Sequence, residues 1–105
     1  MTLQYDHIGI IVDKPKPGMR YFPEFKCWTS DYTTSLYRIE WICFDKGCEF
    51  DPLIQSVSHV GFLVKDIQKA IERKKILFKP VLFEGTWMAF IEEDGAPIEF
   101  FQPEK

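Results

Sequence analysis

One short pattern occurs twice in the chain and constrains its fold more than any other feature. Residues 5–12 read Tyr-Asp-His-Ile-Gly-Ile-Ile-Val, and residues 57–64 read Val-Ser-His-Val-Gly-Phe-Leu-Val. The two histidines, His7 and His59, are the only ones in the chain and occupy the same place in the pattern. A motif repeated in this way indicates a structure built from two similar units.

A second landmark recurs in the same order. Glu49-Phe50 follows His7 at nearly the same spacing along the chain as Glu99-Phe100 follows His59. The whole chain has 105 residues, which is the size of one compact domain. We therefore predict a single domain over 1–105, with a first module over about 1–55 and a second over about 56–105.

The period of a strand gives the repeated pattern a structural meaning. Side chains alternate between the two faces of a strand, so His7 shares a face with Gly9, and His59 shares a face with Gly61. A glycine two positions after each histidine leaves room beside the imidazole. A lone histidine in an apolar strand is more often hydrogen-bonded than a metal ligand. Equivalent placement of both histidines favours one shared site.

The second half predicts the order β-α-β-β-β. Segment 57–64 is apolar and β-branched, which is typical of a strand. Asp66 can cap a helix, and apolar residues follow it at helical spacing, so we expect a helix that ends near 75–77. Further strands are predicted at about 77–82, 86–92 and 97–102, separated by turns at Gly85 and Asp94-Gly95.

The first half has the same opening strand but no equivalent helix. Residues 13–19 contain two prolines and a glycine, and proline inside a helix costs roughly 3 kcal/mol, so a loop is expected there. Strands are predicted at about 24–29, 35–44 and 47–51, and residues 52–55 would link the halves.

Composition excludes several classes of protein. The net charge is −3 without a basic block, so nucleic-acid binding has no electrostatic support. The longest apolar run is too short to span a membrane, and the first residues do not resemble a signal peptide. The three cysteines, Cys27, Cys43 and Cys48, form no C-x-x-C pair, which favours reduced thiols and a cytoplasmic location.

The repeated strand, the β-α-β-β-β order and the late Glu-Phe strand together resemble the glyoxalase/bleomycin-resistance/dioxygenase, or vicinal oxygen chelate, superfamily. The resemblance is strongest over 57–103, where Ser-His-Val-Gly-Phe-Leu-Val-Lys-Asp-Ile (58–67) is similar to the family's strand-to-helix signature, and it is weaker over 13–46. Members of the methylmalonyl-CoA epimerase and glyoxalase I type are closest in pattern. The resemblance implies an α+β fold in which two βαβββ-type modules form a cup-shaped mixed β-sheet, the first with its helix reduced or missing.

The family takes one metal ligand from the first strand and one from the last strand of each module. By position these would be His7, Glu49, His59 and Glu99, with Asp51 competing with Glu49 along the same face. Imidazole and carboxylate donors suit a divalent Zn, Mn, Fe, Co or Ni ion. The resemblance thus implies a divalent metal cofactor.

The implied activity is that of a small metal-dependent isomerase, epimerase or lyase acting on a small oxygen-chelating substrate through a stabilised enolate. Glu99 or Glu49 could move the proton. Glu40 is a third candidate, because an acid within an apolar strand is unusual and burial raises its pKa; otherwise it is a solvent-facing residue paired with a lysine. Glu99 and Glu40 are the predicted catalytic residues.

Three further interpretations accompany this one. A metal-free protein of the bleomycin-resistance type would bind an apolar ligand, which the high Phe and Trp content allows. An extradiol dioxygenase would use His7, His59 and Glu99 around Fe(II), although such enzymes usually have more modules. We also expect a homodimer that covers exposed sheet edges, which light scattering in solution would show as twice the 12.4 kDa chain mass.

Overall fold

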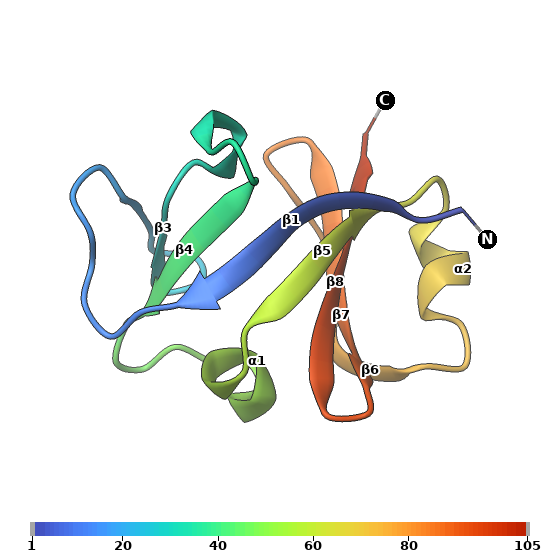
Figure 1. Cartoon of the computed structure of the whole chain (residues 1–105). Helices are drawn as coiled ribbons and strands as arrows, with labels where there is room; N and C mark the ends of the chain where they lie inside the picture. The colour runs from blue at the N-terminus through green and yellow to red at the C-terminus, as the bar shows by residue number, and fades with distance from the viewer. Residues whose placement is uncertain (1, 105) are drawn as a thin grey trace.

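A single curled sheet of eight strands forms the body of the molecule. The computed structural model describes residues 2–104, and Figure 1 shows the strands crossing the whole molecule. The order across the sheet is β2-β3-β4-β1-β5-β8-β7-β6. The strands are β1 (Gln4–Ile11), β2 (Arg20–Phe22), β3 (Cys27–Thr29), β4 (Ile39–Phe44), β5 (His59–Leu63), β6 (Lys75–Phe83), β7 (Thr86–Glu93) and β8 (Ala96–Pro103).

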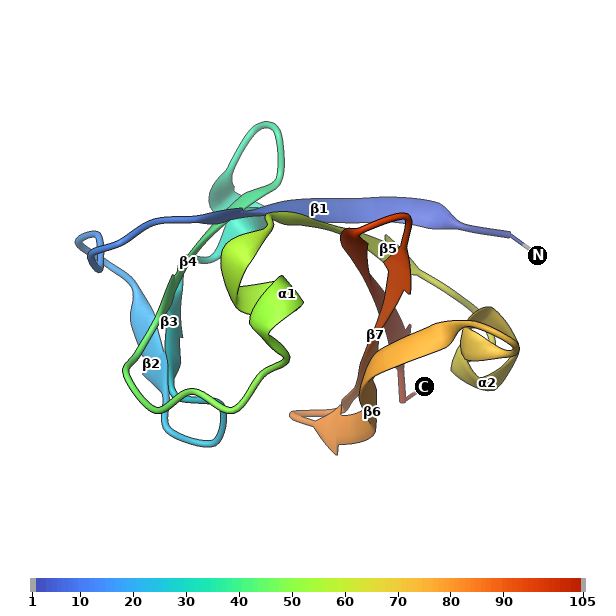
Figure 2. The same ribbon diagram turned by 90° about the horizontal axis from the view of Figure 1, so that it is seen from below.

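The sheet is mixed and curls into a cup, as the turned view in Figure 2 shows. In the middle, β1 and β5 pair antiparallel. On the side away from this junction, β1 pairs in parallel with β4, and β5 pairs in parallel with β8. The outer strands then follow in antiparallel pairs, so the order of strands outward from the β1–β5 junction is the same in both directions. The predicted cup-shaped mixed sheet is confirmed.

The register of the two central strands brings the repeated motifs face to face. His7 lies opposite Gly61, and His59 lies opposite Gly9. A Cβ on Gly9 would stand 2.2 Å from Cε1 of His59, and one on Gly61 would stand 2.3 Å from Cε1 of His7. Each glycine of the motif therefore makes room for the imidazole of the other motif, rather than for its own.

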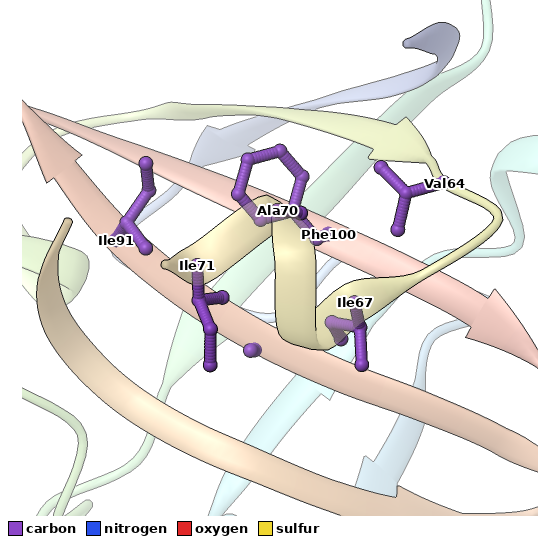
Figure 3. Close-up of a cluster of buried hydrophobic side chains, with 7 residues drawn as sticks. Val64, Ile67, Ala70, Ile71, Ile91 and Phe100 are labelled. Carbon is purple, nitrogen blue, oxygen red and sulfur yellow. The ribbon is translucent and has the colours of Figure 1, made fainter. Parts of the chain in front are cut away.

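A short helix covers the outer face of the second half. α2 (Ile67–Ile71) begins at Asp66, whose carboxylate accepts from the backbone N–H groups of Gln68 and Lys69, as the sequence predicted. Its apolar side packs on β7 and β8, as Figure 3 shows. The buried cluster consists of Val64, Ile67, Ala70, Ile71, Ala89, Ile91 and Phe100.

The first half has no such helix, which also confirms the prediction. Residues 12–19 form an irregular loop between β1 and β2. The other described helices are a 3-10 turn, η1 (Tyr32–Thr34), and α1 (Pro52–Ser56). Of the helices within residues 2–104, none is long and apolar enough to cross a membrane.

Several predicted boundaries are corrected. The helix after Asp66 ends at Ile71 rather than near 75–77, because Arg73 adopts φ 62° and Lys75 already pairs with Glu92 in the β6–β7 hairpin. The predicted strands at 24–29 and 35–44 are shorter, and β2 was not predicted.

Two further corrections concern the end of the first half. Residues 47–51 form a loop instead of a strand. The predicted linker 52–55 is instead part of α1. Asp51 accepts from the Leu53 N–H, and Pro52 stands at the first helical position, where a backbone N–H makes no hydrogen bond within the helix and its absence costs nothing.

The close approach at Gly61 predicts the effect of a single methyl group. Alanine in place of a strand glycine would ordinarily stabilise by roughly 0.5–1 kcal/mol. We expect Gly61→Ala to lower the free energy of unfolding by about 1–3 kcal/mol instead, because the added Cβ meets the buried ring of His7. Urea denaturation of the metal-free protein measures this change. Gln4→Ala, at the exposed start of β1, is the control, and an equally stable Gly61→Ala protein would show that the ring moves freely.

Candidate metal centre

Four side chains from the four central strands converge inside the cup. They are His7 of β1, Glu40 of β4, His59 of β5 and Glu99 of β8, and each offers one donor atom within 4.8 Å of all the others. Each of the four is largely or fully shielded from solvent. These residues form a cluster that can hold a metal ion.

The interatomic distances show how tightly the donors are grouped. His59 Nε2 lies 2.9 Å from Glu99 Oε1 and 3.2 Å from His7 Nε2. His7 Nε2 is 3.1 Å from the same Glu99 oxygen and 3.5 Å from Glu40 Oε1. Glu99 thus contacts both histidines, whereas Glu40 reaches the cluster from one side.

Sheet register explains why these residues meet. Glu40 pairs with Gly9 across β1 and β4, and Glu99 pairs with Gly61 across β5 and β8. In each half, the carboxylate is therefore level with the glycine that lies two positions after the histidine. Glu40, and not Glu49, occupies in the first half the place that Glu99 occupies in the second.

Glu49 lies outside this cluster, which corrects the predicted ligand set. It is exposed in the loop that follows Gly47, a residue with φ 87°, and no strand aligns it with the cup. Asp51, the alternative, is used as the N-cap of α1. The structure brings together His7, His59 and Glu99 as predicted and adds Glu40, which the sequence predicted only as a catalytic residue.

A sequence signal could have placed Glu40 in this cluster. Ile39-Glu40-Trp41 and Ile98-Glu99-Phe100 share the order isoleucine, glutamate, aromatic. The two Glu-Phe pairs are more alike in their spacing from the histidines, and that likeness favours Glu49. In the structure, the donor of the first half comes sooner after its histidine than the donor of the second half does. The reason is that the first half lacks the helix and is shorter before β4.

Burial and mutual contact shift the pKa values of these groups in different directions. Burial by itself would lower the pKa of His7. The hydrogen bond and negative charge of Glu99 outweigh it, together with the charge of Glu40 and the hydrogen bond to Asp6, and the pKa rises to about 9. Burial and repulsion from Glu99 raise the pKa of Glu40 well above its usual range. For Glu99, burial is outweighed by both histidines, and its pKa is held well below its usual range. Bound protons and a divalent ion would therefore compete for this site.

His7 is held in place by a second carboxylate. Its Nδ1 donates to Asp6 Oδ2 at 2.8 Å, and Asp6 is itself buried. Arg38 donates from Nη2 to Asp6 Oδ1 at 3.2 Å and from Nε to the Asp6 carbonyl. Because Asp6 accepts the hydrogen of Nδ1, a His7 ring that loses one proton keeps that hydrogen and turns the lone pair of Nε2 to the cluster. Tyr32 stacks on the same ring at 4.4 Å.

Neither Asp6 nor Arg38 was identified from the sequence. Asp6 directly precedes His7 in a strand, so alternation predicts that the two side chains point to opposite faces. A register shift between Tyr5 and His7 in the β1–β5 pairing changes that local geometry. Sequence pattern alone does not reveal such a shift.

An open cavity of about 600 Å³ adjoins the cluster, and its lining includes Glu40, His59 and Glu99. Volumes of this size are typical of small-molecule sites. Most of the remaining lining is apolar, and seven phenylalanines contribute: Phe22, Phe25, Phe44, Phe50, Phe83, Phe90 and Phe101. A small molecule in the cavity would thus reach three of the four side chains of the cluster, Glu40, His59 and Glu99.

Comparison with known proteins supports the fold alone. No protein-family model and no curated protein matches the chain. Among solved structures, the chain is similar to hypothetical protein BH1468 from Bacillus halodurans C-125, with a TM-score of 0.67 and 18% sequence identity over 100% of this chain and 97% of that one. The overall fold of this chain is therefore similar to that of an experimental structure.

The contact between Asp6 and His7 predicts a loss of metal affinity when the charge is removed. We expect Asp6→Asn to weaken binding of a divalent ion by about 10- to 100-fold, because the amide no longer stabilises a basic, correctly oriented imidazole. Competition with a chromophoric chelator measures the affinity. Ser58 stands in the corresponding place before His59 but accepts from the Ile11 N–H, so Ser58→Ala should leave the affinity unchanged. An unaltered affinity in Asp6→Asn would restrict Asp6 to a role in folding.

Proposed function

We propose that this chain is a small metal-dependent isomerase, epimerase or lyase of the glyoxalase-like type, within the vicinal oxygen chelate superfamily. One observation carries the proposal: two histidines and two glutamates, one from each central strand, meet beside an open cavity. The ligands are His7, Glu40, His59 and Glu99, and the ion is divalent Zn, Mn, Fe, Co or Ni.

The proposal includes a modular interpretation of the fold. The same strand order runs outward from the β1–β5 junction in both halves, and the donor residues occupy equivalent register positions. These features support two βαβββ-type modules, of which the first has a loop at 12–19 in place of its helix. Because the structural match has low sequence identity, this interpretation rests on the chain's own pattern.

The chemistry divides between the ion and the protein. When bound, a divalent ion supplies Lewis-acid stabilisation of negative charge on adjacent substrate oxygens. The protein side chains hold the ion, orient the substrate and move a proton. Glu99 is the more firmly held carboxylate, because its side chain is 5% exposed and contacts both histidines.

Glu40 is the better candidate for the proton carrier. It lines the cavity, its side chain is 16% exposed, and its nearest contact to His7 is 3.5 Å. A carboxylate that is held less firmly and faces the cavity can approach a substrate hydrogen. Glu40 would then accept a proton next to the substrate carbonyl and return it.

A metal-free binding protein of the bleomycin-resistance type is the second candidate function. The observation that favours it is the phenylalanine-rich lining of the cavity. Such a protein has no need for four converging donors, two of them carboxylates buried near one another. The retained cluster therefore makes the metal-dependent enzyme the better-supported proposal.

Metal binding and proton transfer test the proposed function together. The protein should bind a divalent ion with one equivalent per chain, and it should exchange the hydrogens next to the carbonyl of a 2-hydroxyketone for deuterium from D₂O. Elemental analysis and NMR measure the two properties. We expect Glu99→Gln to abolish metal binding and Glu40→Gln to lower the exchange rate by about 100-fold or more.

Glu49→Gln is the matched control for both variants, because Glu49 was a sequence candidate that the fold leaves exposed in a loop. It should retain metal binding and exchange. Loss of metal binding in Glu49→Gln but not in Glu99→Gln would overturn the assignment of the site. A protein that binds apolar compounds and no divalent ion would support the second candidate function.

A further inference from the structure

The phenylalanines of the cavity form one continuous wall that starts at the metal centre. The ring of Phe90 lies 5.1 Å from that of His59, and Phe50 follows at 5.9 Å from Phe90. Phe25 lies 5.6 Å from Phe50, and Phe83 lies 4.9 Å from Phe25. All these distances join ring centroids, and all fall in the range of favourable aromatic contacts.

This wall is assembled from segments that are distant in the sequence. Phe25 lies in the turn between β2 and β3, and Phe50 lies in the loop before α1. Phe83 ends β6, and Phe90 belongs to β7. Because the two edges of the curled sheet both contribute, the rings present apolar surface to the cavity from more than one side. A flat aromatic body can pack there by offset or edge-to-face contact.

An ion pair lies beside the last ring of this series, at the end away from His59. Phe22 of β2 lies 5.8 Å from Phe83, and the guanidinium of Arg20 stands 4.3 Å from the Phe22 ring. Arg20 donates through both terminal nitrogens to the carboxylate of Glu84, with Nη2 2.5 Å from Oε2. Glu84 lies in the tight turn between β6 and β7, so this pair joins the two edges of the sheet.

The charges around the cavity disfavour an anionic ligand tail. Among the described residues that line it, Arg20 is the only lysine or arginine, and its charge is neutralised by Glu84. Asp31 adds a further negative charge to the lining and caps η1. A carboxylate or phosphate on the ligand would thus find no cationic side chain in this lining that is not already paired.

From this wall and this charge pattern we infer the substrate class of the site: a compact aromatic molecule that carries adjacent oxygens for the metal and no other charged group. The inference rests on the proposed function for the oxygen-bearing end and on the cavity for the rest. The volume of about 600 Å³ suits a body of one or two rings. The lining offers no site for a large phosphate- or carboxylate-bearing carrier group.

Three hydroxamates that share one chelating end test this inference on the metal-loaded protein. Benzohydroxamate should bind at least about tenfold more tightly than acetohydroxamate, since only the former has a ring to bury. 4-Carboxybenzohydroxamate, which carries a carboxylate at the far end of the ring, should bind at least about tenfold more weakly than benzohydroxamate. Isothermal titration calorimetry measures all three dissociation constants. Equal binding of benzohydroxamate and acetohydroxamate, or tight binding of the carboxylated probe, would overturn the inference.

Two matched variants separate the wall from the fold. Phe50→Leu should reduce the preference for benzohydroxamate by about threefold or more while acetohydroxamate binding stays unchanged. Phe62→Leu is the control, because Phe62 packs on the α2 side of the sheet, away from the cavity. If Phe50→Leu keeps the full preference for benzohydroxamate over acetohydroxamate, the phenylalanine rings do not bind the aromatic ring of the ligand.

The outcome also distinguishes this inference from the proposed function. If the ion binds but the ring confers no advantage, the substrate class is wrong and the metal centre stands. If no ion binds, benzamide replaces the hydroxamates as a probe without a chelating end. Benzamide binding that Phe50→Leu weakens would then support the aromatic site without the enzyme, and absence of benzamide binding would overturn both.

Discussion

The contact between two strands that run in opposite directions at the centre of the sheet governs the rest of this structure. Each strand carries a histidine and, two positions later, a glycine, and the register places each imidazole over the glycine of the other strand. No side chain larger than hydrogen fits at Gly9 or Gly61 without displacing a ring. Both rings are thereby brought to within 3.2 Å of each other at Nε2. The candidate metal centre follows from that register.

Close packing of ionisable groups gives this centre its chemical character. Two imidazoles and two carboxylates are withdrawn from water in a volume that one ion can span. Charges buried in this way destabilise a protein unless they are paired, and here each is paired with another member of the cluster or with Asp6. The same arrangement that would bind a cation also accounts for the opposite pKa shifts of Glu40 and Glu99.

The two halves of the sheet differ in what they bury. The second half covers its outer face with α2 and forms a compact apolar cluster there. The first half has a loop in place of that helix, and it contributes Phe25, Phe50 and Arg20 to the inside of the cup. The two halves are thus alike where the four side chains of the cluster meet, and they are unlike in the residues that line the cavity.

Local pattern in the sequence determined most of the strands, the turns at Gly85 and Asp94-Gly95, the Asp66 cap and three of the four side chains of the cluster. These features depend on periodicity, turn geometry and residue type over a few neighbouring residues. Tertiary structure alone decided that Glu40, and not Glu49, joins the cluster, since strand register, rather than spacing along the chain, brings a carboxylate level with Gly9. It also decided that Asp6 orients His7 and that four distant phenylalanines form one wall. Those contacts join residues whose separation in sequence carries no information about their distance in space.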